Sequence, residues 1–307
     1  MTRGLDHRVA AAVGTEIVGM RPIGGGSICS AYRAELADGR AAFVKTVARP
    51  QPGFFAAEAV GLALLAGAVP GGGAPVPAVL AVADDLLALE WVEPAAPDAA
   101  SAEDFGRALA ATHRHGAPAF GRTDGTGPAP GYIGSLPLDN TAAATWPEFY
   151  AERRVRPYLR GAVDRRSIRH GDAADVERVL ARIGELAGPP EPPALLHGDL
   201  WSGNVLWAAD DGAPRAADGG AHEARAYLVD PAVHGGHRET DLAMLALFGT
   251  PHLGRVLAAY DESAPVAAGW RDRVPLHQLH PVLVHAVLFD GSYGAQAGAL
   301  AREALRS

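Results

Sequence analysis

The segment Leu195-Leu196-His197-Gly198-Asp199-Leu200-Trp201-Ser202-Gly203-Asn204 decides the fold. An apolar run leads into a glycine turn that presents Asp199, and Asn204 follows five residues later. This is the aspartate-to-asparagine spacing of a kinase catalytic loop, in which the aspartate accepts a hydroxyl proton and the asparagine holds Mg²⁺. A structural Asx turn has the same spacing, so other parts of the chain must distinguish the two.

A second aspartate ends the next apolar run, Tyr227-Leu228-Val229-Asp230-Pro231. Kinase folds carry their second metal-binding carboxylate at this place, and ATP phosphates need a hard cation with oxygen ligands. Asp230 is therefore the expected partner of Asn204 in a magnesium site. Pro231 stands where a protein kinase has phenylalanine, so this is not a protein-kinase activation segment.

Three residues that follow Asp230 have competing interpretations. His234 and His237 allow a zinc site, but no cysteine or third histidine is near in sequence. Asp241, at the start of a predicted helix, is expected to accept hydrogen bonds from the backbone of the catalytic loop. The alternative for Asp241 is a plain negative charge at a helix N-terminus.

The N-terminal part supplies candidates for binding phosphates. Gly24, Gly25, Gly26 and Ser27 separate two predicted strands, and glycine lets backbone N–H groups approach a phosphate closely. Lys45, in Phe43-Val44-Lys45, is the only lysine among 27 basic residues. It lies where a kinase lysine contacts the α- and β-phosphates, and Glu58 on the following helix is the expected ion-pair partner.

Hydrophobic periodicity divides the chain into a sheet-rich and a helix-rich part, so we expect an α+β protein. The first part is predicted as a small antiparallel sheet with one helix, with strands at 17–23, 30–36, 41–47, 78–82 and 86–92 and the helix at 54–68. A Pro/Ala linker at 93–100 suggests a boundary between lobes 1–92 and 93–307. The second part is predicted to be mainly helical, with helices at 105–114, 146–159, 172–186, 240–248, 252–260, 275–288 and 295–305.

These motifs together resemble the fructosamine kinase (ketosamine-3-kinase) family, within the aminoglycoside phosphotransferase and protein-kinase-like group. The resemblance covers residues 17 to 293 and rests on HGDLWSGN (197–204), DPAVHGGHRETDLAM (230–244), GGGSI (24–28), FVK (43–45), EWV (90–92) and WPEFY (146–150). It implies a bilobal protein-kinase-like fold. It also implies an enzyme that uses ATP and Mg²⁺ to phosphorylate the C3 hydroxyl of ketosamines, after which the adduct breaks down and the amine is freed.

The resemblance also implies roles for single residues. Asp199 would be the proton acceptor, Asn204 and Asp230 the metal ligands, and Lys45 a phosphate ligand paired with Glu58. The backbone of Glu90, Trp91 and Val92 would hold adenine, and His197 and Asp241 would support the catalytic loop. Trp201, His237 and His285 are candidate substrate contacts, although packing in the core is an equal alternative for Trp201. Val284 and Leu138 differ from the family pattern, and the 208–226 insertion is longer than usual.

Composition limits the partners. The net charge is −8 and the sequence pI is about 5.8, which argues against nucleic acid and anionic membranes as partners. We find no signal peptide and no run of about 18 apolar residues, so a cytoplasmic protein is expected. Its single cysteine, Cys29, fits a reducing compartment and is either a small buried hydrophobe or an oxidisable thiol. We expect a monomer or weak dimer acting on free or protein-bound ketosamines.

Two rival functions remain at this point. A kinase of the same fold acting on an aminoglycoside or a choline-like alcohol would show the same catalytic residues. A catalytically inactive nucleotide-binding protein is the second rival, but the presence of Lys45, Asp199, Asn204 and Asp230 argues against it.

Overall fold

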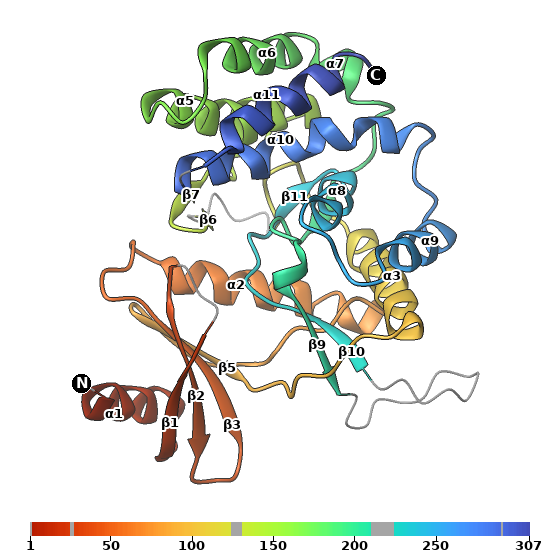
Figure 1. Ribbon diagram of the computed structural model, residues 1–307. Helices are drawn as coiled ribbons and strands as arrows, with labels where there is room; N and C mark the ends of the chain where they lie inside the picture. Colours follow the sequence, from red (N-terminus) through yellow and green to blue (C-terminus); the bar gives the residue numbers. More distant parts are fainter. Residues whose placement is uncertain (1, 25–27, 124–130, 210–223, 290) are drawn as a thin grey trace.

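The computed structural model describes residues 2–24, 28–123, 131–209, 224–289 and 291–307. Its N-terminal part is a five-stranded antiparallel sheet in the order β1-β2-β3-β5-β4 (Figure 1). The strands are β1 (Ile17–Ile23), β2 (Ser30–Leu36), β3 (Ala41–Thr46), β4 (Val79–Ala83) and β5 (Leu86–Glu90). Alternate residues of a strand point to opposite faces, so this sheet has two apolar faces to cover.

One helix covers each face of the sheet. Helix α1 (Thr2–Val13) packs Val9 against Ala34, Val44 and Leu86. Helix α2 (Phe54–Ala66) packs Phe55 and Leu62 against Leu87 and Leu89 on the opposite face. Since Lys45 follows Val44 in β3, its side chain lies on the α2 face, where Glu58 is located.

The larger C-terminal part is mainly helical and contains two hydrophobic cores. Its helices are α3 (Ala99–Arg114), α4 (Trp146–Phe149), a π-helical turn (Tyr150–Val155), α5 (Arg156–Asp164), α6 (His170–Ala181), α7 (Ile183–Leu186), α8 (Glu239–Leu247), α9 (Leu253–Ser263), α10 (Trp270–Leu288) and α11 (Tyr293–Ala304). Three short antiparallel pairs complete it: β6 (Gly131–Ile133) with β7 (Leu136–Leu138), β8 (Ala194–Leu196) with β11 (His234–Gly236), and β9 (Val205–Ala209) with β10 (Ala224–Leu228).

The two parts meet along α2 and the segment after β10. Gly61 of α2 lies so close to Pro231 and Val233 that a Cβ atom there would come within 3.2 to 3.3 Å of their side chains. The Leu228 N–H also donates to the Pro75 carbonyl at 2.8 Å. In Figure 1, the β9–β10 hairpin lies beside α2, below the C-terminal helices. This arrangement leaves a cleft between the sheet and the loop 197–204, and residues of both line it.

The α+β class with a small antiparallel sheet and a larger helical part is confirmed, with four local corrections. The N-terminal part has two helices rather than one, because α1 was not predicted. The β6–β7 hairpin falls in a stretch expected to be loop. Helix α3 begins at Ala99, six residues before the predicted start, and Asp98 and Ser101 form a capping box there. Pro157 lies in the first turn of α5, after the π-helical turn, so the predicted helix 146–159 is three segments.

One segment meets a test of length and composition for a membrane span. Residues 54–71 are long and apolar enough, by length and composition, to cross a bilayer, and 28% of that stretch is buried. Its helical part is α2, whose Phe55, Leu62 and Leu65 are buried in the two adjoining cores. Helices that pack in a protein core have the same composition.

Candidate active site

The cleft contains a cavity of about 610 Å³ that is lined by both parts of the protein. Most predicted site residues lie on its wall: Gly24, Lys45, Glu58, Glu90, Trp91, Val92, Asp199, Trp201, Asn204, Asp230 and His285. His197, His237 and Asp241 do not line it. Gly25, Gly26, Ser27 and most of the 208–226 insertion lie outside the described residues.

Asp199 is presented by a tight turn that follows β8. Gly198 has a φ of +82°, and a Cβ atom there would lie 2.2 Å from the Ala232 carbonyl oxygen, so only glycine fits. The buried Asp241 carboxylate accepts hydrogen bonds from the N–H groups of His197 at 2.8 Å and Gly198 at 3.0 Å. These are the bonds expected for Asp241, and they hold the backbone that carries Asp199.

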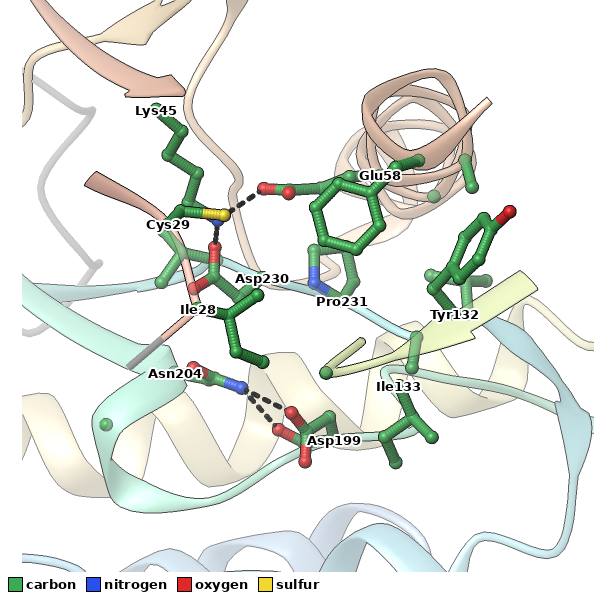
Figure 2. A pocket seen from close by; sticks show the side chains of 18 of the residues that line it. Ile28, Cys29, Lys45, Glu58, Tyr132, Ile133, Asp199, Asn204, Asp230 and Pro231 are labelled. Carbon is green, nitrogen blue, oxygen red and sulfur yellow. Dashed lines mark hydrogen bonds and ion pairs between the residues drawn. The ribbon is translucent and has the colours of Figure 1, made fainter. Parts of the chain in front are cut away.

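Asp199 and Asn204 lie side by side at the lower wall of the cavity (Figure 2). Asn204 Nδ2 donates to the Asp199 carbonyl oxygen at 2.8 Å and to Asp199 Oδ2 at 3.1 Å, so Asn204 Oδ1 is turned away from Asp199. Burial raises the pKa of Asp199 to about 7, although the hydrogen bond from Asn204 opposes the shift. A carboxylate with this pKa accepts a proton readily near neutral pH.

Lys45 connects the two walls of the cavity. It is only 7% exposed, and its Nζ donates to Glu58 Oε1 at 2.8 Å and to Asp230 Oδ1 (Figure 2). A compact ammonium group fits between the two carboxylates, whereas a guanidinium is wider and planar. The predicted pair of Lys45 and Glu58 is therefore present, and Asp230 joins it.

Asp230 has an uncommon backbone conformation. Its φ of +55° lies in the left-handed region, which non-glycine residues rarely adopt. Pro231 packs against α2 next to it, and the Val229 N–H donates to the Asn204 carbonyl at 3.1 Å. These contacts hold the Asp230 carboxylate toward Lys45 and the cavity, where it is 44% exposed.

The oxygen donors at the base of the cavity suit a hard cation. Asp230 offers a carboxylate that is open to solvent, and Asn204 offers an amide oxygen that does not face Asp199. Mg²⁺ prefers such oxygen ligands and keeps part of its water shell. The residues present therefore fit the expected cation.

One end of the cavity lies near β5. Its wall includes Glu90, the last residue of that strand, and the next two residues, Trp91 and Val92. Cys29 also lines the cavity, with its sulfur beside the Lys45 ammonium group in Figure 2. Burial raises the pKa of the Cys29 thiol despite the nearby positive charge of Lys45.

Aromatic side chains surround the opposite end, beyond Asp199. Trp201 is 38% exposed and Phe289 39% exposed, and both line the cavity with His285. The Trp201 ring contacts Phe248 at 6.0 Å between centroids, and His285 contacts Phe248 at 5.0 Å. Trp201 is therefore half-exposed at the cavity rather than packed in the core.

His237 is not brought to the cavity. It is 3% exposed and packs on Trp146 and His277, close to Glu239. The three groups His237, Glu239 and His277 are near enough to share a metal ion. However, the Arg273 guanidinium already donates to both oxygens of Glu239, at 2.5 and 2.9 Å, and supplies the positive charge. His234 lies apart from them, with its Nδ1 bonded to the Ala232 carbonyl, so the structure does not bring His234 and His237 together as the zinc alternative requires.

Sequence reasoning missed two parts of the cavity wall. Tyr132 and Ile133 come from β6, which was expected to be loop. Asn140, from the segment after β7, also lines the cavity. The signal for Asn140 was its rarity, because it and Asn204 are the only asparagines in the chain.

Comparisons with known proteins agree on one family. The family model described as fructosamine kinase matches residues 3–307. A crystal structure from Thermobifida fusca, described as a "putative fructosamine-3-kinase", is 49% identical, has a TM-score of 0.86, and 99% of each chain is covered. The chain therefore belongs to the fructosamine kinase family.

Curated relatives support the same assignment. A protein of Enterococcus faecium named "Probable ketoamine kinase" is 34% identical, covering 91% of this chain and 92% of the relative. A protein-ribulosamine 3-kinase from Arabidopsis thaliana is 30% identical, covering 95% and 84%. A choline kinase from Streptococcus pneumoniae, 15% identical with a TM-score of 0.65 over 100% of this chain and 99% of its own, shares the kinase-like fold.

Proposed function

We propose that this member of the fructosamine kinase family transfers the γ-phosphoryl group of ATP to the C3 hydroxyl of ketosamines. The observation that carries the proposal is that one cavity joins Asp199 and Asn204 with the ion-paired group of Lys45, Glu58 and Asp230. Phosphoryl transfer depends mainly on positioning and on stabilising charge, and these are the groups that do both.

Asp199 is the proposed proton acceptor for the substrate hydroxyl. Its carboxylate faces the cavity, and the turn before it is held by the hydrogen bonds from the N–H groups of His197 and Gly198 to Asp241. A pKa near 7 means that it is ionised at slightly alkaline pH and takes a proton as the hydroxyl becomes an alkoxide.

Asn204 and Asp230 are the proposed Mg²⁺ ligands, and Lys45 the proposed phosphate ligand. When bound, Mg²⁺ supplies charge neutralisation at the phosphates. In the present structure Asp230 is paired with Lys45, so nucleotide binding has to share or replace that contact. Glu58 keeps the Lys45 ammonium group at the wall while this happens.

The two ends of the cavity are proposed to hold different parts of the reactants. Glu90, Trp91 and Val92 would hold adenine, while Trp201 and His285 would contact the ketosamine. Aromatic rings stack well on the C–H faces of sugars and carry little rotational freedom, which supports this assignment for Trp201.

A substrate panel tests the proposal. ADP formation would be measured with Mg-ATP and ribuloselysine, fructoselysine, an aminoglycoside or choline, together with mass spectrometry of the product. We expect phosphorylated ketosamine, followed by release of free lysine. Turnover of an aminoglycoside or choline, with none of either ketosamine, would refute the proposed substrate class.

A further inference from the structure

A fully buried arginine lies directly behind the wall of the cavity. Arg154 is 1% exposed and belongs to the π-helical turn between α4 and α5. Its guanidinium lies 4.4 Å from the centroid of the Phe149 ring and donates to the Asp139 carbonyl at 2.7 Å. It also donates to Asn140 Oδ1 at 2.5 Å, while Nε is buried without a partner.

This arginine is costly for the fold. No carboxylate forms an ion pair with Arg154 among the residues that the structure describes, since Asp139 offers only its backbone oxygen and its carboxylate contacts Arg153. Burial lowers the pKa of Arg154 to about 10, so it stays charged at neutral pH. Buried charges are normally paired, and π-helical turns are frequent at functional sites. The burial of the Arg154 charge therefore suggests that a neighbouring residue has a functional role.

The group that Arg154 holds is the Asn140 side chain. A guanidinium only donates hydrogen bonds, so it can face only the oxygen of the amide. Asn140 Nδ2 must then turn away from Arg154, and it lies 3.5 Å from the Val233 carbonyl oxygen, which is a long contact. Gly131 leaves room for this orientation, because a Cβ atom there would be 2.8 Å from Nδ2.

Asn140 is close to the catalytic turn. Both Asn140 and Asp199 line the same cavity. Val233, which faces Asn140 Nδ2, follows Ala232, whose N–H donates to the His197 carbonyl at 2.9 Å and whose carbonyl abuts Gly198. The amide is therefore attached to the same piece of backbone that supports the Asp199 turn.

We propose that Asn140 is a substrate-binding residue that donates its Nδ2–H to an oxygen of the sugar part of the ketosamine. Arg154 is the positioning residue that fixes the amide so that it presents a donor, not an acceptor. The inference rests on the proposed function. In this arrangement Asp199 supplies the base and Asn140 supplies a hydrogen-bond donor for the sugar. The role of Arg154 would also explain why a buried guanidinium without an ion pair lies behind the cavity wall.

Substitution of Asn140 by aspartate separates this role from a structural one. The new carboxylate would have nearly the same shape as the amide and still accept from Arg154, and it would give the buried guanidinium a counter-charge. The donor toward the substrate would be lost. We expect N140D to reduce kcat/KM for the ketosamine about ten- to a hundredfold. The dissociation constant of Mg-ATP should stay within about twofold, and the urea midpoint should not fall.

Two further variants control the experiment. Ala142 is exposed two residues away, so A142D adds the same charge without touching Asn140 and should leave kcat/KM unchanged. Arg154→Lys keeps the charge but loses the fork, and we expect it also to reduce kcat/KM. If Arg154 acts through Asn140, the double variant N140D/R154K should be little worse than N140D alone, because the two effects are coupled.

The outcomes separate the two proposals. If the wild type phosphorylates no ketosamine, the proposed function fails and the inference fails with it. If the wild type does and N140D matches it, only the inference fails. Equal losses in N140D and A142D would show a general charge effect, and a loss in N140D accompanied by a lower urea midpoint would show a structural role. Either result would overturn the inference.

Discussion

Replacing Asp199 with asparagine should strongly reduce phosphoryl transfer and at the same time stabilise the fold. The carboxyl group has an ordinary pKa of 3.8 and a pKa of about 7 in the folded protein, because burial disfavours its charged form. At about 1.4 kcal/mol for each tenfold change, ionised Asp199 costs the fold at most about 4 kcal/mol. The side chain is partly open to the cavity, so we expect about half of this, ~2 kcal/mol.

The sign and the pH window follow from the two pKa values. A carboxyl whose pKa is raised on folding destabilises the folded state fully above the folded value and ceases to do so as pH falls toward the unfolded value. The amide of the D199N variant never carries this charge and can still face Asn204 with its oxygen. The mutant should therefore be more stable at pH 8, and the difference should shrink steadily as pH falls to 4.

Urea unfolding of both proteins at pH 8, 6 and 4.5, without Mg²⁺ or nucleotide, measures the effect. Phosphoryl transfer in D199N should fall by about 10²- to 10⁴-fold, the usual loss for a general base. A mutant that is less stable than the wild type at pH 8, or one whose gain in stability is independent of pH, would refute the reasoning about Asp199.

Three other predictions concern the residues around Asp199. An acyl-phosphate analogue of ATP should acylate Lys45, with excess Mg-ATP suppressing the reaction, and labelling of Lys45 that ATP does not affect would contradict its assignment to the nucleotide site. Gly198→Ala should lose most activity and about 2 kcal/mol or more of unfolding free energy, since the added Cβ would meet the Ala232 carbonyl. Urea unfolding measures the loss, and a midpoint equal to that of the wild type would contradict this prediction. Asp241→Asn should lower kcat by at least about tenfold with a small change in the KM for ATP, because both backbone N–H groups lose a charged acceptor and one of them then faces the amide NH2; an unchanged kcat would exclude this role.

Much of the N-terminal part was predictable because its strands are local patterns. The alternation around Val44 and Lys45 correctly separates the two faces of the sheet, and helix α2 follows from its spacing. Helix α1 was missed although Leu5, Val9 and Val13 recur at helical spacing, and its Val9 is buried against β2, β3 and β5. The β6–β7 hairpin was missed because three-residue strands in a Gly/Pro-rich stretch leave no periodic signal.

In the site, too, the residues in local sequence motifs were predictable, whereas contacts between distant segments were not. Asp199, Asn204, Asp230, Lys45 and Glu58 were named from the sequence because the order and spacing of kinase motifs are local features. Two other features needed the tertiary structure.

His237 lies next to the same motifs, but the short strand β11 carries it into the core beside Trp146. The role inferred for Asn140 depends on its hydrogen bond from the buried Arg154, which lies fourteen residues further along the chain. No sequence pattern predicts that contact.

Because Lys45 is the only lysine and is buried, it affects how readily this protein itself reacts with sugars. Ketosamines form on the uncharged amines of lysine side chains, and arginine does not give this adduct. The only lysine of the chain is nearly inaccessible and is paired with two carboxylates. This member of the fructosamine kinase family thus exposes almost no side-chain amine on which such an adduct could form.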